Sequence, residues 1–152
     1  MTHQQERNIR IFSTASMEPQ SPTLSMQTLD SLTSVDVDTY AFLLKECGSS
    51  LLDCRRIHGH IIKNGHESNM FLGFLILEMY GKCGSLHDAM AWFSEMPRRD
   101  VCTWNYMIGL HCRLGKGSVS LACFDQMLQE CVLVDKVTYI TIISACTTLP
   151  SS

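Results

Sequence analysis

The sequence predicts an all-α protein, an α-solenoid of stacked antiparallel helix pairs. The pattern V-D-x-x-T-Y-x-x-[LI]-[LI]-x-x-C occurs twice, starting at Val35 and again 99 residues later at Val134. Between the two copies, apolar residues recur at helical spacing, and glycines and a proline punctuate them. A helix pair of about 31–35 residues cannot bury its apolar faces alone, so such pairs stack on their neighbours.

Bulk composition limits the classes of function. The chain has 152 residues, 45% of them hydrophobic and 18% charged, which is enough to fold one domain of ordinary size. A net charge of −3 argues against strong nonspecific attraction to nucleic acid, although it allows a small basic face. No apolar stretch approaches the roughly 18 residues needed to cross a bilayer, so no membrane partner is expected.

Residues 1–36 differ from the rest of the chain. They hold eleven Ser or Thr, two prolines and few large apolar residues. This composition is typical of either a disordered leader or an organellar transit peptide. Arg7 and Arg10 favour the transit peptide, whereas four acidic residues count against it.

The 99-residue period divides into smaller units. Aligning Tyr40, Gly73, Trp104 and Tyr139 gives intervals of 33, 31 and 35 residues. We therefore expect three related units and the start of a fourth, followed by a short tail. The predicted boundaries are 37–69, 70–100, 101–135, 136–149 for the incomplete unit and 150–152 for the tail.

The first unit is expected to contain two helices that end at Gly48 and Gly65. Its second helix carries an apolar face formed by Ile57, Ile61 and Ile62. The spacing of these residues predicts that this face packs on neighbouring helices.

The second unit has the clearest punctuation. Leu75 and Met79 mark its first helix, which Gly84 ends, and Ser85-x-x-Asp88 supplies a capping-box-like start for the second. Pro97 follows that second helix and is expected to end it. One face of this helix holds the remaining apolar residues, namely Leu86, Ala89, Phe93 and Met96.

The third and fourth units are less regular. Cys131 stands where Gly65 stands in the first unit, so we expect that helix end to lack an easy left-handed cap. In the incomplete fourth unit, Ile140 and Ile143 are expected to be exposed because the second helix is missing. The apolar face of the third unit's second helix consists of Cys123, Phe124, Met127 and Leu128.

The eight cysteines predict free thiols. No pair forms C-x-x-C, and no secretory leader is visible, so a reducing compartment is expected. The best metal candidate combines Cys54, His58 and His60. Cys54 and His58 share a helix face, but His60 points elsewhere, and a closed zinc site needs four ligands. We therefore expect no metal and no other cofactor.

Three stretches carry a resemblance to a known family. They resemble the pentatricopeptide repeat family of plants, and the unequal units resemble its subclass in which long, short and standard motifs alternate. In these terms the four units are a long, a short, a standard and an incomplete long motif. The stretches are RRIHGHIIKNG at 55–65, YGKCGSLHDAMAWFSEMPRRDVCTWNYMI at 80–108 and DKVTYITIISAC at 135–146.

The resemblance implies binding of single-stranded RNA, with about one base per repeat read by two or three side chains. In the family, the fifth and last residues of a motif meet the base edge, and second-position residues flank the base. The standard motif supplies the reading pair Asn105 and Asp135, flanked by Cys102 and Val137. An Asn amide offers the donor and the acceptor that the uracil edge needs. This pair favours uracil over cytosine in the family, and Phe71 holds the flanking position in the short motif.

The other motifs depart from this pattern. The short motif pairs Phe74 with Asp100, and phenylalanine stacks on a base but cannot hydrogen bond to its edge. The long motif pairs Ala41 with Asn69, which offers little reading power. Its second-position residue is Asp38, whose charge repels phosphate. The residues of these two pairs are therefore weaker base-reading positions. Only one base of the expected RNA footprint can be predicted.

Structural roles stand beside these functional ones. Asn105 is also acceptable near a helix start, and Asp100 and Asp135 are good N-caps whether or not RNA binds. Trp92 and Trp104 are expected in the core or at its margin. The basic pairs Arg55-Arg56 and Arg98-Arg99 are expected to be solvated, with at most a weak contact to phosphate.

No motif predicts catalysis. Some relatives end in a cytidine-deaminase-like domain, whose H-x-E and C-x-x-C motifs are missing from this sequence. We therefore expect a nonenzymatic RNA-binding protein of mitochondria or chloroplasts, otherwise cytoplasmic, which positions C-to-U editing with other RNA-processing proteins and has no small-molecule substrate. The alternative is a truncated structural remnant or a protein-interaction scaffold.

Overall fold

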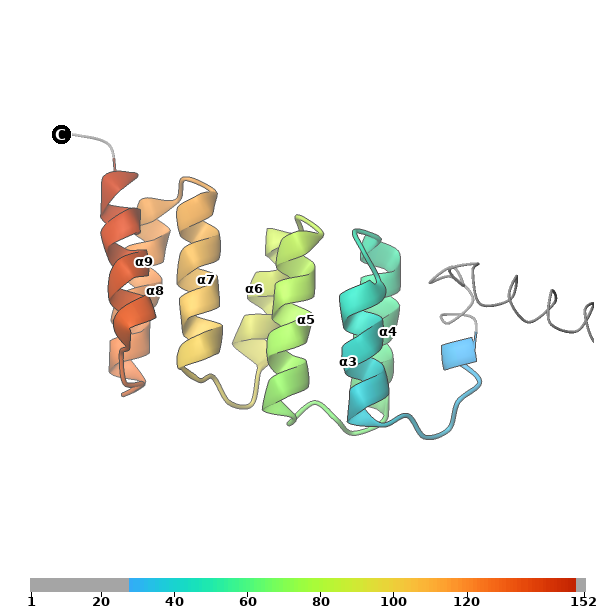
Figure 1. Ribbon diagram of the computed structural model, residues 1–152. Helices are drawn as coiled ribbons and strands as arrows, with labels where there is room; N and C mark the ends of the chain where they lie inside the picture. Colours follow the sequence, from blue (N-terminus) through green and yellow to red (C-terminus); the bar gives the residue numbers. More distant parts are fainter. Residues whose placement is uncertain (1–27, 150–152) are drawn as a thin grey trace, which may run out of the picture.

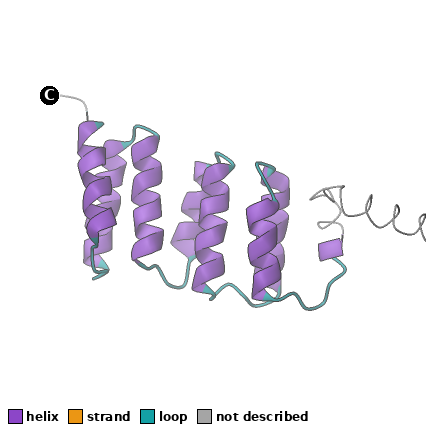
Figure 2. Cartoon of the chain, in the orientation of Figure 1, coloured by secondary structure: helices purple, strands orange, loops and turns teal. Residues whose placement is uncertain are grey.

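The computed structural model describes residues 28–149, and that part of the chain consists of helices joined by loops, without strands (Figure 2). The predicted tail 150–152 and most of the predicted leader, residues 1–27, lie outside the described residues. The fold class predicted from the sequence, an all-α helical solenoid, is confirmed. The helices are α3 (Val37–Glu46), α4 (Leu51–Lys63), α5 (Met70–Lys82), α6 (Leu86–Glu95), α7 (Val101–Arg113), α8 (Gly117–Gln129) and α9 (Lys136–Thr147).

The helices form two layers (Figure 1). The first helix of each pair, namely α3, α5 and α7, stands in one row that α9 completes, and each contacts the next member of the row. The second helices, α4, α6 and α8, lie behind this row. Among residues 28–149, no helix is long and apolar enough to cross a membrane.

Side-chain caps fix where the first helices begin. Asp36, Asn69, Asp100 and Asp135 precede α3, α5, α7 and α9, and each side chain accepts a hydrogen bond from the backbone N–H three residues later. Such bonds satisfy one of the free donors of a helix N-terminus. Lys116, which precedes α8, makes no such bond. The row of first helices therefore has fixed starting points, one in each unit.

Left-handed residues end the helices. Gly65 ends α4 at φ 75°, and Gly115 ends α7 at φ 69°. Cys131 occupies the same place after α8 and adopts φ 57° despite its side chain. Its N–H donates to the Leu128 carbonyl, and the next N–H, of Val132, donates to the Met127 carbonyl. The helix-ending motif therefore forms without glycine, at a conformational cost.

Both tryptophans belong to the core, as the sequence predicted. Trp104 is fully buried and packs edge-on against Phe93, with 4.7 Å between ring centroids. The Trp92 indole N–H donates to the Gly73 carbonyl at 2.9 Å and thus ties α6 to α5. A Cβ at Gly73 would approach the Met96 side chain to 3.0 Å, so glycine allows this close contact between the two helices.

Two residues predicted for apolar packing faces are solvent-exposed instead. Ile62 is 44% exposed and Leu128 is 47% exposed, whereas the preceding residues, Ile61 and Met127, are fully buried. Consecutive residues on a helix are turned by about 100° from each other, so only one of each pair faces the core. Ile140 and Ile143 on α9 are 64% and 65% exposed, as expected.

Ion pairs connect neighbouring units. Arg55 on α4 pairs with Asp88 on α6 at 2.9 Å, and Arg99 pairs with Glu130 at 2.6 Å. The Arg99 guanidinium also lies over the Trp104 ring, 5.6 Å from its centroid, and its side chain is only 22% exposed. Arg99 therefore links α6, α7 and α8 through these contacts and is not a solvated surface side chain.

His58 is held neutral inside the stack. Its Nδ1 forms a 2.9 Å hydrogen bond with the Tyr80 hydroxyl, and its ring packs edge-on against Trp92 with 4.5 Å between centroids. Burial lowers the pKa of His58 to about 4, although the charge of Asp88 acts in the opposite direction. The imidazole therefore fills a packing position as a neutral ring.

The substitution Cys131→Gly is expected to stabilise the protein by about 1 kcal/mol, because glycine adopts the left-handed conformation without the cost of a Cβ. Urea unfolding measures this change. The matched reciprocal variant is Gly115→Ala, where φ is also positive and a Cβ meets no atom within 4 Å, so only the backbone cost acts. Equal stability of Cys131→Gly and the unchanged protein would contradict the assignment.

Folding stability is expected to fall as the pH drops from about 6.5 to about 4, because the unfolded state then binds a proton that the folded His58 refuses. The loss from this residue is at most about 3 kcal/mol, and His111, whose pKa burial also lowers, adds to it. Above the unfolded-state pKa the contribution is fully present. Urea titrations across this pH range measure the slope.

His58→Phe is expected to flatten that slope, because the buried ring that resists protonation is removed. NMR titration of the His58 ring provides the direct check. A midpoint near 6.5 in the folded protein would contradict the neutral, buried ring.

Candidate nucleic-acid interface

A hollow of about 370 Å³ lies on the layer of first helices, between α5, α7 and α9. Its size suits a planar ring of moderate size. Five residues predicted from the sequence line it: two for base reading, one weaker reader and two of the three flanking residues. The complete lining is Phe74, Cys102, Asn105, Tyr106, Gly109, Arg113, Asp135, Val137 and Thr141.

Asn105 and Asp135 meet across the junction between α7 and α9. The Asn105 Nδ2 donates to Asp135 Oδ1 at 3.0 Å. The same oxygen accepts from the Thr138 N–H and hydroxyl, each at 2.9 Å, and the Thr138 hydroxyl accepts from the Asp135 N–H, which completes a capping box. Asp135 therefore starts α9 and fixes the direction of the Asn105 amide at once.

Hydrogen bonds keep Asp135 ionised. The Thr138 backbone N–H, followed by the Asn105 amide, holds the pKa of this carboxyl below its usual value. The group is a hydrogen-bond acceptor at neutral pH, so it can hold the donor side of an amide but cannot itself donate to a base.

The acceptor atom of Asn105 is left without a donor. Its Oδ1 is buried at the atomic level and has no hydrogen-bond partner among the described residues. An unsatisfied buried acceptor costs free energy, which a ligand N–H reaching it would recover. Asn105 thus lines the hollow with an amide that Asp135 orients, and the unused Oδ1 of this amide is closed to solvent, so a ligand reaches it only after the side chain shifts.

Aromatic and basic groups form the rest of the hollow. Phe74 packs edge-on against Tyr106, with 5.8 Å between centroids, and the Arg113 guanidinium lies 5.6 Å from the centre of the Tyr106 ring. The Tyr106 hydroxyl donates to the Glu78 carbonyl, which anchors the ring to α5. Aromatic edges and a cation therefore surround the amide of Asn105.

The remaining predicted site residues lie outside this hollow. Ala41 is 6% exposed and packs in the core, while Phe71 is 51% exposed with the Lys45 ammonium 5.8 Å from its ring centre. Asn69 and Asp100 act as N-caps, accepting from the backbone N–H of Leu72 and Thr103 respectively, each at 2.9 Å. Of the predicted base-reading pairs, Asn105 with Asp135 is therefore the one whose two residues both line the hollow described above.

Four residues of the hollow were not predicted from the sequence, namely Tyr106, Gly109, Arg113 and Thr141. Helical spacing would have found the first three, because residues 102, 105, 106, 109 and 113 share one face of α7. Thr141 lies one turn after Val137 on α9. Its contact with α7 depends on how two helices pack, which no spacing along one helix reveals: a Cβ at Gly109 would lie 3.6 Å from the Thr141 methyl group.

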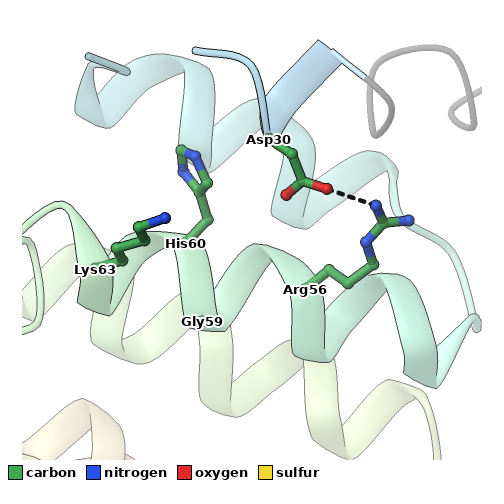
Figure 3. Close-up of a pocket in the computed structure, with 5 residues that line it drawn as sticks. All are labelled: Asp30, Arg56, Gly59, His60 and Lys63. Atoms are coloured by element: carbon green, nitrogen blue, oxygen red, sulfur yellow. Dashed lines mark hydrogen bonds and ion pairs between the residues drawn. The ribbon is translucent and has the colours of Figure 1, made fainter. Parts of the chain in front are cut away.

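A second hollow, of about 320 Å³, lies beside α4 and is lined by Asp30, Arg56, Gly59, His60 and Lys63 (Figure 3). Asp30 neutralises Arg56 through a 2.7 Å ion pair, which Figure 3 marks. The His60 Nδ1 is engaged by the Tyr40 hydroxyl at 2.7 Å. Lys63 has no ion-pair partner among the described residues, so its ammonium is the one unpaired charge that this hollow offers a ligand.

The metal candidate weighed from the sequence is not assembled. His60 bonds to Tyr40 and His58 bonds to Tyr80, on separate sides of α4. Within residues 28–149, no group of three His, Cys, Asp or Glu side chains has an arrangement that would hold a metal ion.

Comparisons with known proteins agree with the repeat pattern. Residues 99–148 match the PPR repeat family, and residues 75–101 match the PPR repeat. The helical repeats of this chain belong to the pentatricopeptide repeat family. The first match contains α7 and α9 and every residue that lines the hollow at Asn105 except Phe74.

Relatives from Arabidopsis thaliana show similar identities. The pentatricopeptide repeat-containing protein At2g33680 is 41% identical over 110 residues, which cover 71% of this chain and 15% of that protein. The relative At3g02330, named mitochondrial, is 36% identical over 113 residues, 73% of this chain and 12% of that protein. The relative At4g18520, named chloroplastic, is 36% identical over 110 residues, 71% of this chain and 18% of that protein. The chain thus spans less than a fifth of the length of these relatives.

The double role of Asp135 in the pentatricopeptide repeats can be separated by two substitutions. Asp135→Ser is expected to keep the cap of α9 and lose the bond to Asn105, because serine caps helices well but has a shorter side chain. Asp135→Ala is expected to lose both and to unfold at a lower urea concentration. Urea midpoints of the two variants measure the difference. Equal destabilisation by Ser and Ala would show that the cap is not what Asp135 contributes to stability.

Proposed function

We propose that this chain is part of a sequence-selective, single-stranded RNA-binding protein of mitochondria or chloroplasts. The observation that carries the proposal is the Asn105 amide, held by Asp135 and left with an unused acceptor in a hollow. Membership of the pentatricopeptide repeat family supports RNA as the ligand. The relatives named mitochondrial and chloroplastic support the organelle.

The Asn105 amide suits a pyrimidine edge. Uracil presents an N–H donor beside a carbonyl acceptor, and an amide with a free acceptor and a free N–H complements both. One amide hydrogen is spent on Asp135, so the other remains for the base. We therefore propose uracil as the preferred base at this position and cytosine as the second, flanked by Cys102 and Val137.

Electrostatic attraction to the RNA backbone is expected to be modest. The net charge is −3, and Arg55, Arg56 and Arg99 are each paired with a carboxylate. Arg113 lines the hollow and stacks on Tyr106, so it is the cation placed to meet a phosphate there. Phosphate contacts position a strand without reading it. Arg113 is therefore proposed to add affinity regardless of sequence.

The finer biological role proposed is the recognition of RNA processing sites, in particular sites of C-to-U editing, together with other RNA-processing proteins. The alternation of long, short and standard motifs over 37–69, 70–100 and 101–135 supports this role. In this proposal the chain supplies recognition, and a partner protein supplies the chemistry.

A second candidate function is a protein-interaction scaffold. The observation that favours it is the apolar surface of α9, where Tyr139, Ile140 and Ile143 are 58–65% exposed. Capture experiments with and without ribonuclease separate the two functions. A protein partner retained after ribonuclease treatment supports the scaffold, whereas loss of all captured material supports RNA binding.

Asn105→Ala is expected to abolish the preference for one base, because alanine offers the base edge no donor or acceptor. Anisotropy titrations with short RNAs that differ in one base measure the preference at low salt. The expected loss is about 5-fold to 100-fold in discrimination, corresponding to about 1–3 kcal/mol for a lost base-edge contact.

The matched control is Gln126→Ala, which removes an exposed amide from α8 in the other layer. Arg113→Gln is expected to weaken all RNAs alike and to leave the base preference intact. If Asn105→Ala retained the base preference of the unchanged chain, the assigned reading role would be wrong.

A further inference from the structure

Three thiols from two neighbouring repeats lie close together, with the thiol of Cys54 between the other two. Cys54 Sγ lies 3.4 Å from Cys47 Sγ and 3.0 Å from Cys83 Sγ. Cys47 follows the last residue of α3, Cys83 follows the last residue of α5, and Cys54 sits in the first turns of α4. The central thiol therefore faces one thiol of its own repeat and one of the next repeat.

We propose that Cys54 and Cys83 form a reversible disulfide that locks the first helix pair to the second. A disulfide bond is about 2.05 Å long, so the two sulfur atoms need to approach by about 1 Å. The bond would join α4 to the end of α5 and fix the spacing of two adjacent repeats.

Exposure favours this pair over Cys47 with Cys54. Cys83 is partly exposed, whereas Cys47 and Cys54 are 6% and 0% exposed. An oxidant from solvent therefore reaches Cys83 first. Burial raises the pKa of both Cys47 and Cys54, so neither is a ready nucleophile toward solvent.

The chemistry balances with a small-molecule disulfide as the oxidant. The Cys83 thiolate attacks one sulfur of that disulfide, which releases one small thiol and leaves a mixed disulfide on Cys83. Cys54 then attacks the Cys83 sulfur and passes its proton to the departing sulfur of the small molecule, which leaves as the second small thiol. Two protein thiols are oxidised, and one small disulfide is reduced to two thiols.

The arrangement makes Cys54 an exclusive partner. It can bond to Cys83 or to Cys47, but not to both at once, so one of the two outer thiols always stays free. A bond to Cys47 would close only the short connection between α3 and α4 within one repeat. A bond to Cys83 spans 29 residues of chain and constrains the junction between repeats.

Disulfide mapping tests the proposal on the full chain. The protein is equilibrated with rising ratios of oxidised to reduced glutathione, quenched with acid, alkylated and digested with trypsin. Residues 46–55 then form one peptide that holds Cys47 and Cys54, and residues 83–98 form another that holds Cys83. The expected product is a bridge between these two peptides, without retained glutathione.

Single substitutions identify the bonded thiols. The bridge is expected to persist in Cys47→Ser, to vanish in Cys54→Ser and Cys83→Ser, and to be unaffected by Cys112→Ser, which lies in α7. Thermal unfolding of the oxidised chain is expected to shift upward by more than about 5 °C and to return on reduction. Oxidation confined to residues 46–55, or glutathione attached without any bridge, would overturn the proposal. Neither readout depends on RNA binding.

Discussion

The constraint on which the structure depends is the side-chain cap at the start of each first helix. Asp36, Asn69, Asp100 and Asp135 fix the first residue of α3, α5, α7 and α9, and thus the rotation of every later residue about the helix axis. Each cap costs little to form and satisfies a donor that would otherwise be free. At Asp135 the same carboxylate continues across the junction to the amide of Asn105. One side chain therefore both caps α9 and orients the amide proposed to read a base.

A second constraint is how the protein uses its few charges. Arg55 and Arg99 hold neighbouring units together through Asp88 and Glu130, and Arg99 also covers the ring of Trp104. Surface ion pairs contribute little stability each, but they fix the angle at which units stack. Because each of these guanidinium groups is paired with a carboxylate, it attracts the phosphates of a nucleic acid only weakly. Recognition by such a chain therefore rests on shape and oriented hydrogen bonds more than on attraction at a distance.

Much of the fold was predictable because its signals are local. Capping and helix-ending residues act within a turn or two of the chain, so they can be identified from their spacing in the sequence. Examples are Ser85, Gly65 and Pro97. The behaviour of Cys131 was not, because two backbone hydrogen bonds after α8 outweigh the cost of a left-handed cysteine. The prediction that Ile62 packs on neighbouring helices was also wrong, because Ile61 takes the buried position. An apolar pattern marks a helix face only to within one residue.

The candidate site divides in the same way. Asn105 and Cys102 were predicted because the resemblance to the pentatricopeptide repeat family assigns them to the reading and flanking positions of the standard motif. Thr141 lines the hollow because α9 packs against α7, and that contact has no signature along either helix. The three thiols are a stronger case, since Cys47, Cys54 and Cys83 stand 7 and 29 residues apart and share no motif. Only the stacking of helix pairs brings them together.

Along α5, Phe74 lies near the N-terminal end, whereas Cys83 follows the C-terminal end. Phe74, at the hollow, and Cys83, beside Cys54, lie about 13 Å apart along the same rigid helix α5. A bond that fixes the Cys83 end of α5 against α4 therefore restricts how α5 can tilt, and the tilt sets where Phe74 stands relative to Tyr106. Because α5 contacts both α3 and α7, a change in its tilt cannot stay within one repeat. The proposed disulfide would therefore act, through α5, on the side of the hollow that Phe74 forms.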